Sequence, residues 1–383
     1  MSVLLIAFHN CSPINSKSVD VGTSLVDLPA QEEIIAGKYS LKYALQKGLV
    51  DIYHNPWVVR PIDDTIQNLE LIAPGAVLEL GFLYGGVSQE FLNRIAGIAD
   101  QIHLKQPHTL LGARFQEHLD IVNYPLRTIA CGKSANTLTY DHRLMVSDQY
   151  SGVYYWLDPT KNETQKYLIC LGKSFIDAGF TMIGITNAYG IASRRGNIAE
   201  TMAAFRAVQL ELDNYAKEIG SVIYWGGEVV TTEDFKTDYA FEPMRVFDLN
   251  SWGEGFRNKI YRPGVGVGYS FVLSEAIVVE RKSHLKKSAQ IIFYVDNYDG
   301  ENDDLARFME LDAINRRYMI SMSKFIAKKE GAFVSWPLSH CEGCIQPSRI
   351  VDSCNLIPNS NLSGYNAFAC GDFPAIIESH KIF

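Results

Sequence analysis

Several features that define large classes of protein are missing from this chain of 383 residues. No uninterrupted apolar run approaches the roughly 18 residues of a membrane span, so no membrane-spanning helix is expected. The opening segment MSVLLIAFHNCSP has a short apolar run but no basic segment and no small-residue cleavage pattern. It is therefore not recognised as a signal peptide, and the localisation stays open.

Clustered positive charge is also missing. The formal net charge is −8, and no block of about five like charges occurs. Proteins that bind nucleic acid present a basic patch or stripe to the phosphate backbone. The sequence therefore predicts no nucleic-acid partner. Its richest basic segment, ERKSHLKK (280–287), is more typical of a solvated helix face.

The motifs of several enzyme classes are absent. No GxGxxG follows a strand and opens a helix, and no Walker phosphate loop, HExxH or GxSxG occurs. The segment GVGVGYS (264–270) has the glycines but lacks a preceding apolar strand. These absences argue against a dinucleotide-binding fold, a zinc protease and a serine hydrolase. We expect no cofactor.

What the chain does contain is an alternation of short apolar runs and long amphipathic segments. Such alternation is typical of parallel βαβ units, and seven or eight units in this length favour a (β/α)8 TIM-type barrel. Strands are expected at 76–86, 109–115, 152–159, 181–187, 221–228, 291–297 and 331–337, with an eighth at 244–250 or 366–372. Helices are expected at 40–50, 88–100, 162–179, 197–220 and about 303–329.

Local signals set the ends of two of these helices. Ser88 is a plausible N-cap for the helix at 88–100. Asn162 is expected to cap the helix at 162–179, with Gln165 at the capping-box position and Gly179 ending it.

Three parts are expected along the chain. An irregular N-terminal segment (1–75) packs on the barrel, and the (β/α)8 core occupies 76–340 with an insertion around 229–290. A Cys-rich C-terminal segment (341–383) completes or flanks the barrel.

The segment YYWLDPTKNETQKYLICLGKSFIDAGFTMIGITN (154–187) resembles a segment of (β/α)8-barrel glycoside hydrolases. In those enzymes a strand ends in Asp-Pro, here Asp158-Pro159, and the following helix ends in an Asp-x-Gly-Phe turn, here beginning at Asp177. The resemblance implies a carbohydrate ligand and hydrolysis of a glycosidic bond. This chain departs from the pattern at the end of the next strand, where Asn187 stands in place of the catalytic Asp that is common there. Either the catalytic pair lies on other strands, or the barrel has lost the chemistry.

Acids, amides and aromatic rings recur where the expected strands end, which is where barrel enzymes place their working residues. Glycoside hydrolysis needs two carboxyl groups, about 5 Å apart for retention or roughly 6.5–9.5 Å for inversion. We predict Asp296 and Glu228 as the catalytic pair, with Asp158 and Glu117 in reserve. The expected substrate-binding residues are Tyr84, Glu117, Trp156, Asp158, Asn187, Trp225, Asp299, Trp336 and His340.

Structural explanations of the same residues stay open. Asp158 before a proline is also typical of a turn that leads into a helix, and Glu228 is also typical of a solvated loop. Asp296 is compatible with turn chemistry. Barrel packing accounts for each tryptophan as well as sugar stacking does.

The seven cysteines leave redox state and metal binding open. Cys341, Cys344, Cys354 and Cys370 lie close to the C-terminus, where disulfides, a structural zinc and free thiols are all compatible with their spacing. Disulfides there would fit a secreted protein. Cys170, on an apolar helical face, is expected to be an ordinary core residue. The acidic segment from Asp296 fails the EF-hand spacing, so we predict no metal site.

The sequence thus predicts a carbohydrate-active barrel protein that is a glycoside hydrolase. A non-catalytic carbohydrate-binding or effector protein on the same barrel is the first alternative, and Asn187 favours it. A barrel phosphodiesterase ranks last because only His118 and His340 lie near strand ends.

Overall fold

The computed structural model describes residues 34–52, 66, 69–81, 85–133, 137–185, 188–227, 240–245, 289–294, 312–314, 316–318, 320–321, 331–340, 365–366 and 370–380. Within these ranges no helix is both long and apolar enough to cross a membrane.

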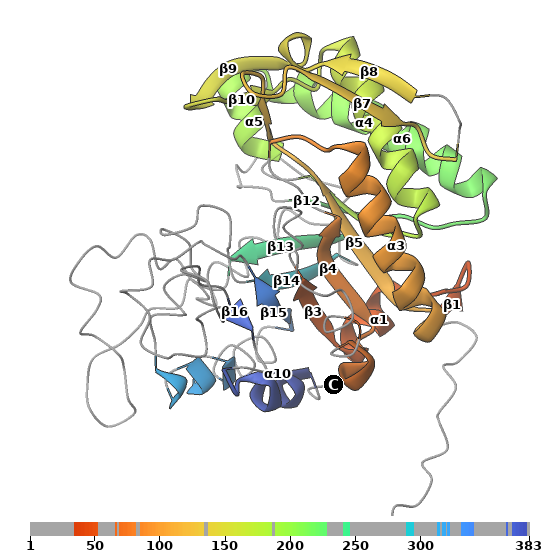
Figure 1. Ribbon diagram of the computed structural model, residues 1–383, viewed down its shortest axis with the longest axis vertical. Coiled ribbons are helices and arrows are strands. Elements are labelled where there is room, and N and C mark those ends of the chain that lie inside the picture. Colours follow the sequence, from red (N-terminus) through yellow and green to blue (C-terminus); the bar gives the residue numbers. More distant parts are fainter. Residues whose placement is uncertain are drawn as a thin grey trace, which may run out of the picture.

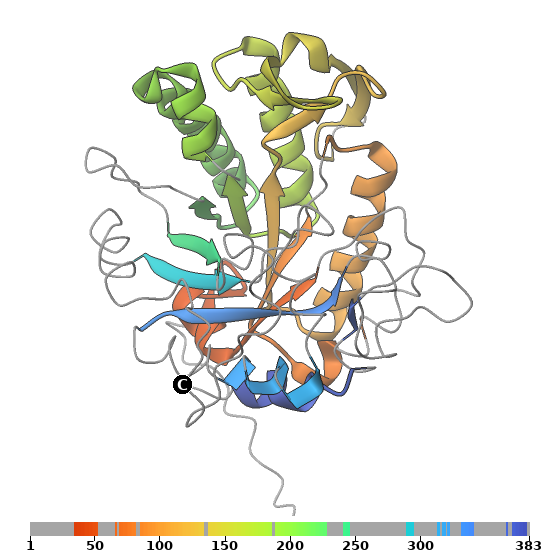
Figure 2. The same cartoon turned by 90° about the vertical axis from the view of Figure 1, so that its left-hand side faces the viewer.

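The centre of the fold is a ring of parallel strands in chain order. Each strand pairs in parallel with the next, and the last, β15, pairs in parallel with the first, β3, so the sheet closes on itself. Figure 2 shows the blue strand of the C-terminal half running beside strands of the N-terminal half, as this closure requires. The ring consists of β3 (Leu49–Ile52), β4 (Ala76–Gly81), β5 (Leu110–Phe115), β11 (Met182–Ile185), β12 (Tyr224–Gly227), β13 (Phe241–Arg245), β14 (Gln290–Tyr294) and β15 (Phe333–His340).

This ring is the closed parallel barrel that the sequence predicts, with corrections to its strands. β3 lies inside the segment 1–75 that was expected to be irregular. The sequence did not predict this strand, because its apolar run is too short to stand out from the helix before it. The eighth strand is β13, which overlaps the expected 244–250 only at its end. The other boundaries of the three expected parts stay a prediction, and most of the segments 1–33 and 341–369 lie outside the described residues.

The N-terminal end of the barrel is filled with apolar side chains. The helix α1 (Leu41–Lys47) packs there, and its Leu41, Ala44 and Leu45 join residues from the strand starts. Ala76, Leu110, Met182, Ile292 and Phe333 belong to the same buried cluster. Alternation along the strands turns these side chains inward, where they form an apolar plug. This end of the barrel is built for stability.

Helices surround the ring, and two of the predicted caps can be judged. Ser88 caps α3 (Gln89–Lys105), and its hydroxyl accepts from the Phe91 N–H at 3.2 Å. For α4 (Asn162–Asp177), Lys161 occupies the N-cap position without a side-chain bond, so the predicted cap at Asn162 is wrong. α5 (Ala188–Arg195) and α6 (Ile198–Glu218) follow β11, and α10 (Phe373–His380) lies near the C-terminus.

A long excursion, residues 116–161, separates β5 from α4. It holds the antiparallel sheet β6 (His118–Asp120), β10 (Tyr154–Leu157) and β9 (Val146–Ser151), and the hairpin β7 (Leu126–Ala130) and β8 (Thr137–Asp141). Figure 1 shows the strands β7–β10 in the upper part of the view, above the barrel strands. β10 was predicted as a barrel strand. Its apolar run does mark a buried strand, but it pairs antiparallel with β6 and β9, because an apolar run does not specify the sheet that a strand joins.

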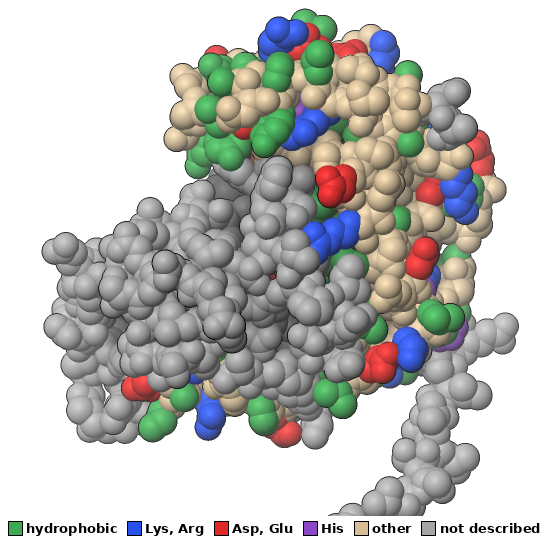
Figure 3. All heavy atoms as spheres, viewed as in Figure 1, with side chains coloured by type: hydrophobic (Ala, Val, Ile, Leu, Met, Phe, Trp, Pro, Cys, Tyr) green, Lys and Arg blue, Asp and Glu red, His purple; other side chains and the backbone are tan. Residues whose placement is uncertain are grey.

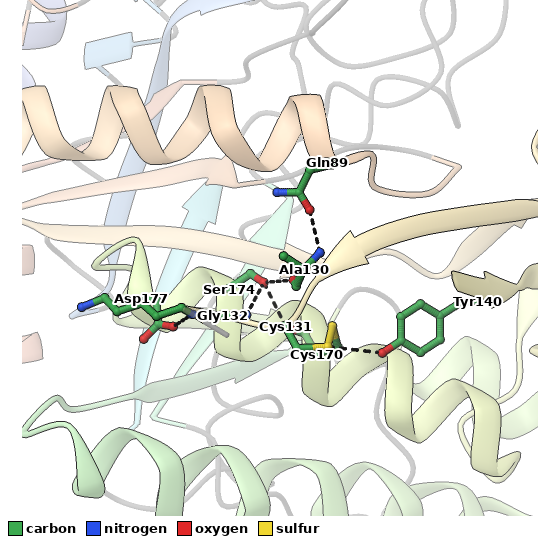
Figure 4. Close-up of a disulfide and its surroundings, with 9 residues drawn as sticks. Gln89, Ala130, Cys131, Gly132, Tyr140, Cys170, Ser174 and Asp177 are labelled. Carbon is green, nitrogen blue, oxygen red and sulfur yellow. Dashed lines mark hydrogen bonds between the residues drawn. A yellow bond between two sulfur atoms is a disulfide. The ribbon is translucent and has the colours of Figure 1, made fainter. Parts of the chain in front are cut away.

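A disulfide between Cys131 and Cys170 ties this excursion to α4 (Figure 4). Ser174, one turn further along α4, donates to the carbonyl of Ala130 at 2.8 Å and accepts from the N–H of Gly132 at 3.0 Å. The expectation that Cys170 is an ordinary core residue is therefore wrong. It is buried as expected, but helical periodicity cannot reveal a partner that lies far away in sequence.

Candidate functional site

Side chains from the excursion and from α5 meet beside the end of β5. We call Glu117, His118, Tyr150, Trp156 and Arg194 the strand-end cluster. Glu117 and His118 directly follow the end of β5, and Arg194 lies in the last turn of α5, the helix that follows β11. β5 and β11 are neighbouring parallel strands, so the chain leaves both at the same edge of the barrel. The cluster therefore lies at the C-terminal edge, where barrel enzymes carry their sites.

Three rings of the cluster pack against one another. The His118 and Tyr150 rings stack with centroids 3.8 Å apart and an interplanar angle of 22°. Trp156 meets both rings, with centroids 4.2 Å from His118 and 5.1 Å from Tyr150. Trp156 and His118 are buried, whereas Tyr150 is 40% exposed. Tyr150 therefore offers a supported aromatic surface to solvent.

The Glu117 carboxylate lies beside the His118 ring of this stack. Oε1 of Glu117 is 3.3 Å from Nδ1 of His118. Burial, and then the nearby Arg194 guanidinium, lower the pKa of His118 to about 3. The imidazole is thus neutral at neutral pH, so its contact with Glu117 is not an ion pair.

Asp158 has a structural role in this arrangement. Its Oδ1 accepts from the N–H of Thr160 at 3.0 Å and from the Thr160 hydroxyl at 2.7 Å, which shapes the turn into α4. Its Oδ2 forms an ion pair with Arg195 of α5. Asp158 is buried, and both of its oxygens are engaged. The structure thus favours the turn explanation of Asp158 over its use as a reserve catalytic acid.

Two of the predicted aromatic residues lie on the outer face of the ring. The indole of Trp225 donates to Asp213 of α6 at 2.7 Å, and its ring packs near Phe115. Trp336 is fully buried in the core between the strands and the surrounding helices, and it pairs with Val50. Strand alternation explains both placements. The residue before Trp225, Tyr224, faces inward and packs against the N-terminal plug, and the residue before Trp336 is the buried Ser335. Barrel packing, the explanation left open for these tryptophans, accounts for both placements.

Glu117 and Trp156 both adjoin His118 in the strand-end cluster, whereas six further candidates have no described side chain. The predicted catalytic pair, Asp296 and Glu228, lies outside the described residues. Tyr84, Asn187 and Asp299 lie outside them too. His340 ends β15, and nothing further is described for its side chain. The roles of these residues stay predictions.

The barrel interior also holds polar side chains that the sequence analysis missed. The Arg114 guanidinium lies 4.9 Å from the centre of the Tyr294 ring. β5 and β14 are not neighbours in the ring, so this contact crosses the barrel. Asp51 and Ser335 are also buried, at positions that alternation places inside. The signal was available in the sequence: Arg114 follows Leu110 and Gly112 at every second position of one strand.

A metal centre finds no support in the part of the chain that the structure describes. No group of three or more His, Cys, Asp or Glu side chains there could hold an ion. Cys370 is disulfide-bonded, and its partner lies outside the described residues. This leaves one fewer free thiol for a zinc site near the C-terminus.

No protein-family model and no curated protein matches this chain. Matching solved structures include a cyclic α-maltosyl-(1→6)-maltose hydrolase from Arthrobacter globiformis, at 8% identity and a TM-score of 0.49, which covers 88% of this chain and 83% of that one. A Nostoc punctiforme debranching enzyme matches at 10% identity and a TM-score of 0.44, covering 89% of this chain and 81% of that one.

Eubacterium rectale Amy13B matches at 9% identity and a TM-score of 0.44, covering 75% of this chain. This chain spans 64% of the length of that protein. All three of these structures are glycoside hydrolases with (β/α)8 barrels. The assignment of a barrel to this chain rests on the strand pairings.

Proposed function

We propose that this protein binds a carbohydrate at the C-terminal edge of its barrel and hydrolyses a glycosidic bond there. The observation that carries the proposal is the strand-end cluster, in which a carboxylate and a half-exposed, stacked aromatic ring adjoin at the end of β5. Flat aromatic faces pack against the apolar faces of sugar rings, and carboxyl groups are what glycosidic cleavage requires.

The chemistry assigns two tasks to carboxyl groups. A protonated carboxyl donates its proton to the glycosidic oxygen as the bond to the anomeric carbon breaks. A second carboxylate either attacks that carbon or removes a proton from the water that attacks it, so that one water is consumed in total. Asp296 and Glu228 are the proposed pair, and Glu117 is the carboxylate proposed to bind the sugar beside Tyr150.

The test combines turnover with binding for the full chain. A panel of oligosaccharides is assayed for released reducing ends, and each is titrated calorimetrically. Glu228→Gln and Asp296→Asn are expected to lower kcat by about 100-fold or more while the fold is kept, since positioned proton transfer supplies roughly that factor. Glu117→Gln is expected to raise the Kd for the sugar with a smaller effect on kcat.

Two results would contradict this proposal in different ways. Full activity in both Glu228→Gln and Asp296→Asn would exclude this catalytic pair. Sugar binding by the unaltered protein with no turnover on any substrate would favour the non-catalytic carbohydrate-binding protein instead.

A further inference from the structure

The most unusual charged group of the strand-end cluster is Arg194. α5 ends with two adjacent arginines, Arg194 and Arg195, whose partners differ. Arg195 is paired with the buried carboxylate of Asp158. Arg194 is exposed, and its guanidinium lies 5.2 Å from the centre of the Trp156 ring. Within the described residues, no carboxylate forms an ion pair with Arg194.

A guanidinium held against an aromatic ring is preorganised for a ligand. Contact with the ring restricts the guanidinium while the N–H groups along its edge stay able to donate. A planar carboxylate is the partner that such an edge binds with two parallel hydrogen bonds. This position thus lowers the entropic cost of binding an anion, compared with a freely rotating arginine.

The Trp156 side chain on which Arg194 packs provides a second hydrogen-bond donor. The indole Nε1–H of Trp156 is buried, and it has no acceptor among the residues that the structure describes. Buried donors are paired in most native structures, so an unpaired one indicates a missing acceptor. The neutral state of His118 leaves Arg194 as the cation of the cluster, because burial and Arg194 itself keep the pKa of that imidazole near 3.

We propose that the strand-end cluster binds an acidic sugar, a uronic acid residue, whose carboxylate is held by the guanidinium of Arg194 while its ring packs on Tyr150. This inference rests on the proposed carbohydrate site and adds the chemical class of its ligand. A positive charge near the C-terminus of α5 also interacts favourably with the helix dipole. If that were its only role, Arg194 would contribute to stability and not to ligand binding. The test therefore has to separate ligand recognition from helix stability.

The experiment titrates the full chain with matched pairs of oligosaccharides. Oligomers of galacturonic, glucuronic and mannuronic acid are each compared with their carboxyl-reduced, neutral counterparts by calorimetry. At least one acidic oligomer is expected to bind about 10- to 100-fold more tightly than its neutral counterpart, the range that a charged hydrogen-bonded pair supplies. Raising the salt concentration is expected to reduce the preference.

Arg194→Gln is expected to abolish the preference, so that its affinities for the acidic and the neutral oligomer become equal. Arg194→Lys keeps the charge without the planar edge, so an intermediate preference is expected. Lys217→Gln is the matched control, because Lys217 is an exposed basic residue in the last turn of α6. Its affinities are expected to equal those of the unaltered protein. Circular dichroism checks that each variant is folded.

The outcomes distinguish the inference from the function on which it rests. Equal affinity for acidic and neutral oligomers would overturn the acidic-sugar inference and leave the carbohydrate site standing. An unchanged acidic preference in Arg194→Gln would also overturn it. Tighter binding of a sulfated oligosaccharide than of every uronide would overturn the carboxylate assignment. Failure to bind any oligosaccharide would overturn the proposed function as well.

Discussion

The two ends of the barrel differ in the side chains that gather there, although the same strands form both ends. At the N-terminal end, the strands turn apolar side chains inward, and α1 packs on the resulting plug. At the C-terminal end, the chain leaves β5 into a long excursion that carries Glu117, His118 and Tyr150. One end is closed by hydrophobic burial, while the other gathers charge and aromatic surface. This difference is the reason for proposing the binding site at the C-terminal end.

The excursion also exposes apolar side chains. Figure 3 shows hydrophobic side chains gathered over the upper lobe, where the excursion lies. The exposed large apolar residues of the excursion are Val122, Tyr124, Leu126, Leu138, Leu144 and Tyr150. The apolar side chains of the N-terminal plug, in contrast, are buried. Substitutions should therefore affect stability at one end and ligand binding at the other.

The largest effect is expected at the plug. Leu110→Ala removes a fully buried side chain from a packed cluster, so we expect a loss of about 2–5 kcal/mol in the free energy of unfolding. Chemical denaturation measures it. Leu104→Ala is the matched control, because Leu104 is 80% exposed, and a change under about 0.5 kcal/mol is expected. Sugar affinity of the folded Leu110→Ala protein should be unchanged; a large change in affinity would contradict the division between the two ends.

The disulfide of the excursion should give the next effect. Removing the Cys131–Cys170 bond is expected to lower stability by about 2–4 kcal/mol, because it constrains a loop with a sequence separation of 39. Cys131→Ala, Cys170→Ala and the double variant should cost similar amounts, since each breaks the same bond. Denaturation midpoints compare the three. Additive losses in the double variant would show that the thiols contribute separately and that the bond is absent.

A smaller loss is expected where the excursion meets α5. Asp158→Asn keeps the shape and the turn hydrogen bonds but removes the charge that pairs with Arg195. We expect a loss of about 1.5–3 kcal/mol in stability, the range for hydrogen bonds to charged groups. The structural assignment of Asp158 further requires that kcat stay within a few-fold of the unaltered protein. A loss of about 100-fold in kcat at unchanged fold would restore Asp158 as a catalytic acid.

The smallest effect concerns pH. Burial lowers the pKa of His142 to about 4, below the value of about 6.5 of an unfolded histidine. Between these values the unfolded chain binds the proton and the folded chain does not, so stability falls as the pH drops from 7 to 5. His142 should contribute about 1–2 kcal/mol to this fall. Unfolding measured at both pH values should show a smaller fall in His142→Asn; an equal fall would contradict the assignment.

Much of the barrel could be predicted because short apolar runs and amphipathic helices repeat locally along the chain. Ser88 could be recognised as a cap for the same reason, since a cap is a contact across a few residues. β3 was missed because four residues carry little periodic signal. The antiparallel pairing of β10 was missed because pairing direction depends on residues distant in sequence.

The candidate site divides in the same way. The sequence placed Glu117 and Trp156 among the site residues, because acids and aromatic rings that follow apolar runs mark strand ends. The sequence could not reveal Arg194, because this residue lies on α5, outside the excursion that supplies the rest of the cluster. It also placed Trp225 at the mouth, whereas alternation along β12 turns this ring outward against Asp213.

The sequence by itself determined the succession of strands and helices, because hydrophobic periodicity is a local property of the chain. It also determined which residue types stand at the strand ends. Only the tertiary structure decided that the ring closes between β15 and β3, that Cys131 meets Cys170, and that His118 packs on Tyr150. These are contacts between distant segments, and their formation depends on how the whole chain buries its apolar surface.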